Sequence, residues 1–532
     1  MTFNLLTTPW LPVRRADGTT GQITPDQLTA TPANPIVALD APRPDFNGAL
    51  VQFLIGLLQT ACAPADREAW FDRLESPPDP EQLAATFAPF IDAFHLDGDG
   101  PRFMQDLDPL TDQKPLPITA LLIDTAGSAT HFVKDLAQQG FSPATAAMGL
   151  YTLQTNAPSG GAGHRTSLRG GGPLSTLILA APEDGSPATL WQTLWLNVLP
   201  ADTELFTKAE VAQRPEAIFP WLRPTRTSEK GGKETTPIDV HPLQQFWGMP
   251  RRIRLDFEST TDEYCGLTGM ASPLLVRQYR TKNYGANYTG AWAHTLTPYN
   301  HDPAKGPPTA MHPRGSLRYR HWLGLVKTLD DKKVQRIPAA VVSRFHSYDY
   351  GLAREGWRYR LWAFGYDMDN MKPRCWHEST FPLFNFDDAG QRRAFESAAA
   401  ALIQAAGEFL NNLRNALKDA WFSDKDPRRK KADTGFVEDA FWAETEAPFY
   451  DHLQTLAQAG DHALARRAVF DSWHAQLHGY TLDAFERWAN AAAIADQSHP
   501  KRVAEASRWM RINNHGKAIK ALLDLPDKRE AA

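Results

Sequence analysis

The chain has 532 residues, of which 42% are hydrophobic and 22% are charged. This composition is that of an ordinary folded globular protein, and it excludes a disordered or fibrous chain. A chain of this length exceeds what one hydrophobic core supports, so two or three domains are expected. The first residues lack the basic and then apolar pattern of a secretory signal, and we therefore expect a cytoplasmic protein.

The first part of the chain, to about residue 385, combines helical and strand-like segments with many Gly and Pro breaks. Leu50–Ala61 predicts a buried helix, because its apolar run is short for a membrane span and is interrupted by glutamine. Ser175–Ala181 and Arg252–Phe257 predict strands, the second because apolar and charged residues alternate. Clusters of Gly, Pro and Thr predict long loops, which in compact proteins are often functional. These loops span 156–172, 223–237 and 302–315.

From about Gln391 the apolar residues recur at helical spacing and form four amphipathic segments. Pro448 is expected to kink or split the second of them. Four such segments joined by polar loops predict an up-and-down bundle. We therefore expect an α+β protein, with a large irregular mixed α/β N-terminal domain over 1–385 and a C-terminal four-helix bundle over 386–532. The apolar positions that define the segments are Phe395, Leu402, Phe409 and Leu413; Phe436, Phe441, Phe449 and Leu453; Leu464, Phe470, Trp473 and Leu477; and Ala506, Trp509, Met510 and Leu523.

No motif in the sequence amounts to a catalytic or metal site. The three cysteines, Cys62, Cys265 and Cys375, are far apart in the sequence, which excludes a CxxC zinc knuckle or redox pair. His301-Asp302 could belong to a metal-dependent phosphohydrolase, but no second pair of this kind accompanies it. The other histidines of this stretch are typical of surface or hydrogen-bonded structural residues. We therefore predict no catalytic residue, no metal and no cofactor.

The formal net charge of −5 is unevenly distributed along the chain. Residues 1–130 contain 7 Lys and Arg against 17 Asp and Glu, whereas residues 277–345 contain 12 Lys and Arg against 3 Asp and Glu. In the second stretch Tyr, Trp and His lie between the basic residues, a mixture typical of phosphate neutralisation combined with base or sugar contacts. A solvated basic face, or a face for an acidic protein partner, would have the same pattern.

The most unusual segment is Asn156–Gly172, which contains six glycines and which we call the glycine loop. Glycines let the backbone approach a ligand closely, and successive amides can form an anion-binding concavity. Arg165 and Arg169 are expected to add positive charge to it. His164-Arg165 stands where a P-loop needs Gly-Lys, which argues against a nucleotide cradle of that type. An ordinary flexible loop is the alternative interpretation.

Several separated motifs occur in an order that is typical of one family. They are Asn4–Leu6, Trp10–Val13, Arg102–Gln105, Gly127–Thr130, Gln154–Pro158, Ser167–Gly171, Leu196–Pro200, Phe246–Trp247, Trp292 with His294, and Gly365–Tyr366. Together with the C-terminal helical segments they cover nearly the whole chain. On these motifs the chain resembles the CasA family, the large subunit of the type I-E CRISPR Cascade complex.

The resemblance implies a non-catalytic subunit of a multi-subunit complex for antiviral defence, with both DNA-binding and RNA-binding roles. Such a subunit recognises the protospacer-adjacent motif in duplex DNA through the minor groove. It also helps to open the duplex for guide-RNA pairing and R-loop formation. The implied partners are the crRNA, the target double-stranded DNA, the backbone, small and 5′-handle-binding subunits, and a recruited helicase-nuclease.

The resemblance also assigns roles to individual residues. A DNA-binding set from the glycine loop and a lysine finger comprises Gly160, Gly161, Gly163, Arg165, Lys282 and Asn283. A wedge that splits the first base pairs comprises Met368, Asp369, Asn370 and Met371. A loop over Ala126–Gln139 is implied to contact the crRNA and neighbouring subunits through Phe132 and Lys134. Some family members have a cysteine zinc site, of which only Cys265 remains here, so no zinc is expected.

Two other functions stay open on the residues alone. One is a metal-dependent nuclease that uses His301, Asp302 and nearby histidines. The other is a structural scaffold whose basic stretch binds an acidic protein partner.

Overall fold

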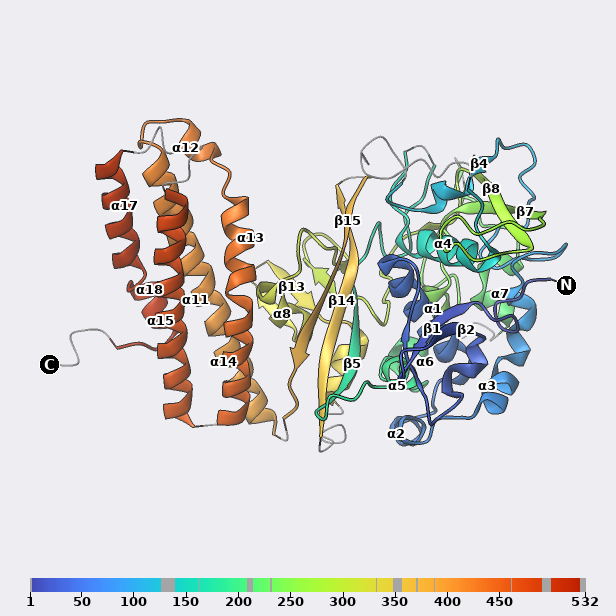
Figure 1. The fold of residues 1–532 in the computed structure, drawn as a ribbon, viewed down its shortest axis with the longest axis horizontal. Helices are drawn as coiled ribbons and strands as arrows, with labels where there is room; N and C mark the ends of the chain where they lie inside the picture. The colour runs from blue at the N-terminus through green and yellow to red at the C-terminus, as the bar shows by residue number, and fades with distance from the viewer. Residues whose placement is uncertain are drawn as a thin grey trace. The chain divides into compact units, whose positions relative to one another are not determined.

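The structure is a computed structural model that describes residues 2–125, 139–161, 163–207, 214–229, 232–331, 333–347, 356–369, 372–386, 388–460, 462–489 and 499–526. These residues form two compact units, one mixed and one helical (Figure 1). The first contains the described residues up to Leu317 and from Gly324 to Leu383, and the second contains Arg318–Leu323 and those from Phe384 onward. The predicted α+β class is confirmed, because helices and several small sheets share the first unit and the second is helical.

The centre of the first unit is the helix α1 (Pro44–Cys62), which is buried over most of its length. Pro44 occupies the first turn, where its missing N–H costs no helical hydrogen bond. The Phe53 ring makes edge-on contacts with other aromatic rings at centroid distances of 5.3 to 5.9 Å. Aromatic pairs in this geometry add to the stabilisation from burial. The predicted buried helix Leu50–Ala61 is therefore confirmed.

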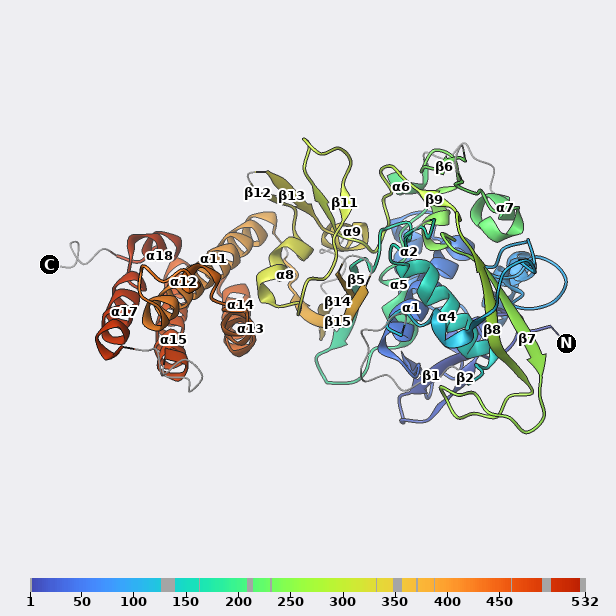
Figure 2. The ribbon, with the colours of Figure 1, turned by 90° about the horizontal axis from the view of Figure 1, so that it is seen from above.

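The helix α4 (Pro143–Asn156) packs against α1 and leads into the glycine loop. Ser142 caps its N-terminus by accepting a hydrogen bond from the Thr145 amide. Beside α4 lies an antiparallel sheet with the order β4–β8–β7 (Figure 2). Its strands are β4 (Leu116–Pro117), β8 (Leu274–Lys282) and β7 (Arg252–Ser259). The predicted strand Arg252–Phe257 is confirmed within β7.

A second antiparallel sheet has the order β15–β14–β5. Its strands are β5 (Ser175–Pro182), β14 (Trp357–Asp369) and β15 (Lys372–Leu383). β14 and β15 form one long hairpin, which we call the wedge hairpin (Figure 1). An irregularity between Asp367 and Met368 shifts the register just before its tip. The predicted strand Ser175–Ala181 is confirmed as β5.

Two buried side-chain amides form hydrogen bonds with backbone N–H and C=O groups, in the way that a neighbouring strand would. Asn197 accepts a hydrogen bond from the Ile178 amide and donates one to the Ile178 carbonyl, at 2.8 and 2.9 Å. Gln154 in α4 similarly accepts from the Arg251 amide and donates to the Arg251 carbonyl, at 3.0 and 2.9 Å. Buried polar groups require such partners, so these amides connect segments that are far apart in the sequence.

The remaining strands are short. They are β1 (Leu11–Arg15), β2 (Thr20–Ile23) and β3 (Ile36–Leu39) in one sheet, β10 (Tyr299–His301), β11 (Thr309–Ala310), β12 (Leu329–Asp331) and β13 (Val334–Ile337) in another, and the parallel pair β6 (Glu234–Thr235) and β9 (Asn287–Tyr288). Two of the predicted long loops, 223–237 and 302–315, therefore contain short strands, β6 and β11. Strands of two residues are too short to show an alternating pattern in the sequence, so they could not be predicted.

The remaining helices of the mixed region are also short. The α-helices are α2 (Arg67–Glu75), α3 (Pro80–Phe87), α5 (Leu190–Trp195), α6 (Glu204–Thr207), α7 (Pro215–Ile218), α8 (Tyr319–Val326) and α9 (Ala340–Ser347). The 3₁₀ helices are η1 (Pro25–Thr29), η2 (Ala88–Phe94), η3 (Ile118–Leu121), η4 (Pro220–Leu222) and η5 (Pro242–Phe246).

The second unit is a bundle around the long helix α11 (Ala389–Trp421), which contacts all the other longer helices of the bundle. These are α13 (Gly435–Glu444), α14 (Glu446–Ala459), α15 (Ala463–Ala489), α17 (Pro500–Asn513) and α18 (Lys517–Leu522), with the short α12 (Arg428–Lys431) in a connection. The second predicted segment is divided at Thr445 into α13 and α14. Pro448 lacks the N–H that would bond to the Glu444 carbonyl in a continuous helix. The predicted split of the second segment is confirmed.

The bundle core follows the predicted apolar stripes, with three exceptions. The stripe on α11 is buried at Phe395, Leu402, Phe409 and Leu413, while Ile403 beside it is partly exposed. Leu464 is 87% exposed, Trp509 is 40% exposed and Phe436 is also exposed, so their assignment to the core is wrong. Leu464 lies in the first turn of α15, and helical spacing alone does not show where the packed part of a helix begins.

A group of three histidines lies between α15 and the end of α17. The ring of His515 lies 4.8 and 4.7 Å from the rings of His474 and His478, measured between centroids. The pKa of His478 is lowered, first by burial and then by the charges that His515, His474 and Arg511 would carry. Proton uptake therefore favours the unfolded chain.

We expect the melting temperature to fall as the pH drops from about 7 to about 5. The contribution of His478 is complete above its ordinary pKa of 6.5 and is lost as the pH falls through its lower folded pKa. Thermal unfolding of the full chain, followed by circular dichroism at both pH values, measures this fall in melting temperature. His478→Gln should reduce the fall, whereas the exposed His462→Gln should not. An equal fall in both variants would contradict the assignment.

Candidate nucleic-acid interface

The glycine loop connects the end of α4 to the start of β5. Two backbone hydrogen bonds close it, from the Ser167 amide to the Ala157 carbonyl at 3.0 Å and from the Gly172 amide to the Asn156 carbonyl at 3.1 Å. Gly161, Gly163, Gly170 and Gly172 have positive φ angles, which side chains of L-residues rarely adopt. The loop is therefore a folded turn whose conformation requires glycine.

Gly163 contacts the segment that follows β8. Its carbonyl accepts a hydrogen bond from the Tyr284 amide at 2.7 Å. A Cβ at Gly163 would lie 2.9 Å from the Asn283 Cβ and 3.0 Å from the Tyr284 ring, closer than real Cβ atoms come. The structure thus brings the predicted glycine loop and the predicted lysine finger into direct contact.

Gly160 and Gly161 differ in the space around them. Gly160 is exposed, but a Cβ there would lie 2.7 Å from the His164 Cβ, so a side chain at this position would overlap the loop itself. A Cβ at Gly161 would meet no atom within 4 Å. Gly161 is therefore the predicted glycine whose backbone is open to an approaching ligand.

Arg165 connects the loop to a third segment. Its Nε donates to the Ser228 hydroxyl at 2.8 Å and its Nη2 donates to the Ser228 carbonyl at 2.9 Å. Ser228 in turn donates to the Gly285 carbonyl at 2.7 Å, and its amide donates to the Tyr284 carbonyl. The guanidinium therefore supports the backbone after β8, and its predicted contact with DNA stays a prediction.

Arg169 points inward, which contradicts the expectation that it adds charge to the loop's surface. Its guanidinium donates to Ser175 Oγ and Thr297 Oγ1, both at 2.9 Å, and to Gln52 Oε1 at 2.6 Å. Burial lowers its pKa to about 10. Three neutral oxygens replace the water that a buried cation loses. Arg169 therefore fastens the loop to α1 and β5.

Lys282 is the last residue of β8 and is 33% exposed at its side chain. Its Nζ lies 3.1 Å from Asp112 Oδ2, and this hydrogen bond lowers the pKa of the Asp112 carboxyl. Exposed ion pairs of this kind are weak, because water screens them and both side chains lose freedom. An acceptor on a ligand can therefore take the place of Asp112.

The wedge hairpin is anchored near its tip, at the paired residues Tyr366 and Trp376. Tyr366 donates a hydrogen bond at 2.6 Å to the buried carboxylate of Asp45, in the first turn of α1. A Cβ at Gly48 would lie 2.7 Å from the Trp376 ring, so this ring packs directly on the α1 backbone. Both strands of the hairpin are thus held by one helix.

The other end of the glycine loop touches the same hairpin. A Cβ at Gly172 would lie 2.8 Å from the Tyr366 Cβ and 3.0 Å from the end of the Met368 side chain. Met368 is half-buried, and Asp369 is exposed and pairs with Lys372 at the last described step of the ladder. The predicted tip residues Asn370 and Met371 lie outside the described residues, as do Phe132 and Lys134.

The basic stretch at 277–345 does not form a free positive surface, because many of its cations are ion-paired. The pairs are Arg277 with Glu258 and Glu263, Arg280 with Asp256, Lys282 with Asp112, Lys305 with Asp302, Arg318 with Glu446, and Arg320 with Glu438. Charge counting along the sequence missed these acids because most are distant in the chain.

His294 and Asp302 of this stretch have ordinary structural partners. His294 is buried, its Nδ1 accepts from the Leu296 amide at 3.1 Å, and burial lowers its pKa well below the usual value. Asp302 is paired with Lys305 at 3.1 Å. Across the ranges that the structure describes, no group of three His, Cys, Asp or Glu side chains is arranged to hold a metal ion. Within the same ranges, no helix is both long and apolar enough to cross a membrane.

Sequence reasoning missed Ser228 and Gln52, on which the loop depends. Ser228 lies 63 positions from Arg165, and Gln52 lies 117 positions from Arg169. Their residue types are common, and the only signal available was that two arginines in a glycine loop need acceptors somewhere in the fold.

Comparing alanine substitutions at Gly161 and Gly163 separates the cost of a left-handed backbone from the cost of steric overlap. Gly161→Ala should cost about 1–2 kcal/mol, the penalty for a left-handed backbone. Gly163→Ala should cost more, since its Cβ also overlaps Asn283 and Tyr284. Urea unfolding of the full chain measures both free energies. Equal losses would show that Gly163 does not press against the segment after β8.

Comparison with known proteins is consistent with this arrangement. The family described as CRISPR-associated protein Cse1 matches residues 4–484. Cse1 from Acidimicrobium ferrooxidans has a similar structure, with a TM-score of 0.67 at 17% identity over 98% of this chain and 99% of that chain. CasA of Thermus thermophilus has a TM-score of 0.66 at 19% identity over 97% of this chain and 100% of that chain.

A chain of a structure described as a CRISPR RNA-guided surveillance complex has a TM-score of 0.67 at 16% identity, covering 97% of this chain and 100% of that chain. At these identities the structural matches show a shared fold. The family match covers most of the sequence. The chain therefore belongs to the CRISPR-associated Cse1 family, and the resemblance to CasA inferred from its motifs is confirmed.

Proposed function

We propose that this protein is the non-catalytic large subunit of a type I-E CRISPR Cascade complex, and that it recognises the protospacer-adjacent motif in duplex DNA. One observation carries the proposal. The glycine loop touches the segment after Lys282 through Gly163 and the wedge hairpin through Gly172. Three elements that the resemblance assigned separately are thus connected through the glycine loop, which supports a joint role for them.

Gly161 and Lys282 suit a minor-groove contact. The groove is about 6 Å wide and offers mainly acceptor atoms, so a backbone without side chains can enter it and a lysine can donate to its base edges. Gly161 has open space where a side chain would be. Lys282 would have to break only its exposed ion pair with Asp112 to contact a base. A readout of this kind tolerates several sequences, because the pattern of acceptors in the minor groove is degenerate.

The wedge hairpin suits the opening of the first base pairs. Separating stacked bases costs a few kcal/mol, so an inserted side chain must be attached to a rigid part of the fold. The hydrogen bond from Tyr366 to Asp45 and the packing of Trp376 on Gly48 supply such a support. Pairing of the guide RNA with the target strand then offsets the cost.

The partners follow from membership of the family. One similar chain comes from a CRISPR RNA-guided surveillance complex, which supports assembly with crRNA and other Cascade subunits. We propose that Phe132 and Lys134 contribute to the crRNA and subunit contact, that Met368, Asp369, Asn370 and Met371 form the wedge, and that a helicase-nuclease is recruited to the opened target. The assembled complex would act in the cytoplasm.

Lys282→Ala tests the readout in the reconstituted complex. Binding to DNA with a preferred adjacent motif should weaken about tenfold, because one lost contact to a base edge costs about 1–3 kcal/mol. Electrophoretic mobility shifts with a library of adjacent motifs, at one stated salt concentration, measure it. The exposed Lys425→Ala in the bundle is the matched control. Unchanged binding by Lys282→Ala would exclude this residue from motif recognition.

Nuclease activity would overturn the non-catalytic assignment. The isolated chain should leave plasmid DNA intact in the presence of divalent metal ions. Cleavage that EDTA abolishes and that His301→Ala removes would support the metal-dependent nuclease instead.

A further inference from the structure

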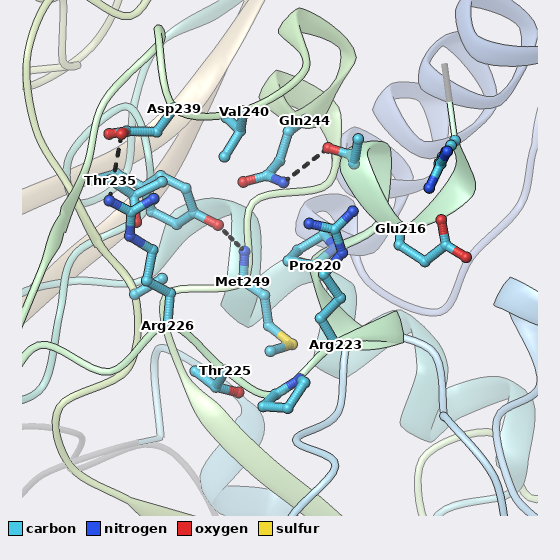
Figure 3. Close-up of a pocket in the computed structure, with 15 residues that line it drawn as sticks. Glu216, Pro220, Arg223, Thr225, Arg226, Thr235, Asp239, Val240, Gln244 and Met249 are labelled. Atoms are coloured by element: carbon cyan, nitrogen blue, oxygen red, sulfur yellow. Dashed lines mark hydrogen bonds and ion pairs between the residues drawn. The ribbon is translucent and has the colours of Figure 1, made fainter. Parts of the chain in front are cut away.

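A cavity of about 310 Å³ lies in the first unit, between the segment 214–226, the segment 235–249 and β9 (Figure 3). Its volume is at the lower end of the range for small-molecule sites in proteins. None of the residues assigned to duplex recognition lines it. One wall continues into Ser228, which supports the backbone after β8.

Three arginines surround the cavity: Arg214, Arg223 and Arg226. Arg214 and Arg223 are exposed, and the guanidinium group of neither forms an ion pair or hydrogen bond with a described residue. Arg226 lies 3.4 Å from Asp239, but its Nε is buried and has no acceptor within the described part of the chain. Figure 3 shows Arg223 and Arg226 on either side of Met249. The cavity thus offers guanidinium donors that no residue in the described ranges uses.

Two hydroxyls add to this excess of polar groups. The side-chain oxygens of Thr225 and Thr235 are buried and have no hydrogen-bond partner among the residues described. Thr235 is only 3% exposed. Leaving a buried polar group unpaired costs about 1–3 kcal/mol. Three such atoms around one cavity, counting Arg226 Nε, indicate that a polar ligand completes their hydrogen bonds.

The charges around the cavity favour an anion. Asp239 accepts hydrogen bonds from the amide and hydroxyl of Thr236 at 2.8 and 2.7 Å, and these bonds lower the pKa of its carboxyl. Its charge therefore offsets Arg226, and the exposed Glu216 offsets one further arginine at the rim. One positive charge remains. Guanidinium groups match phosphate oxygens in geometry as well as in charge.

Part of the cavity wall is apolar and contains an aromatic ring. It is formed by Met249, Val240, Pro220 and Tyr288, and Met249 lies between Arg223 and Arg226. The Tyr288 hydroxyl accepts a hydrogen bond from the Met249 amide at 2.9 Å, and its ring lies edge-on to Trp292. These contacts hold the ring in place as part of the wall. A wall of this kind suits a flat, partly apolar body attached to the anion.

We propose that this cavity binds a nucleoside phosphate, with the phosphate among the arginines and threonines and the base against the apolar wall. The same chemistry occurs in a free nucleotide and in one nucleotide of a single strand. The proposal does not rest on recognition of the adjacent motif, since it uses different residues.

The test uses isothermal titration calorimetry with the full chain. The probes are the common nucleoside monophosphates, the matching nucleosides, and a short single-stranded oligonucleotide. At least one phosphate-bearing probe should bind, and the corresponding nucleoside should bind about tenfold more weakly or worse. Arg223→Gln with Arg226→Gln should weaken the binding of that probe by about tenfold or more. Thr235→Val keeps the side-chain shape and should weaken it several-fold.

Arg223→Gln alone removes no ion pair or side-chain hydrogen bond with a described residue, so it keeps the test valid if the double variant does not fold. The exposed Arg508→Gln in the bundle is the matched control and should bind as the unchanged chain does. Binding of monophosphates identifies a free nucleotide as the source, and binding of the oligonucleotide alone identifies a strand. Absence of binding by every phosphate probe, or affinities unchanged in the arginine and threonine variants, would overturn the proposal.

Discussion

The path of the glycine loop depends on two positions where only glycine, which has no side chain, can be accommodated. From α4 the backbone must reach the segment after β8 and then enter β5 beside the wedge hairpin. Gly163 and Gly172 lie so close to Asn283 and Tyr366 that a Cβ on either would overlap them. Both also have positive φ angles. One short segment therefore contacts both the lysine finger and the hairpin.

The distribution of charge in the first unit differs from what its sequence suggests. Arg169 remains a cation inside the fold, since a pKa of about 10 still leaves it protonated at neutral pH. It also lowers the pKa of the buried His294, after the larger effect of burial. At the surface, the basic stretch is largely neutralised by acids from elsewhere in the chain. Of the cations described above, Arg214 and Arg223 have no ion pair with a described residue, and Lys282 has only an exposed one.

Regular elements were predictable because their periodicity is local. The helix α1, the strands β5 and β7, and the α11 stripe all have spacings that reflect one buried face. The break before Pro448 follows from a missing amide hydrogen, which is also a local property. Leu464 and Trp509 were misassigned because periodicity identifies a helical face but not the extent to which neighbouring helices cover it.

The sequence by itself determined the family, the α+β class, and the residue types of the glycine loop and the lysine finger. Only the tertiary structure decided that Arg165 braces Ser228 while Arg169, four positions later, turns into the core. It also decided that Asp112 pairs with Lys282 and that segments 214–226, 235–249 and 286–288 enclose one cavity. These outcomes depend on contacts between residues far apart in the chain. Such contacts form only when the whole core packs, so no local pattern of residues records them.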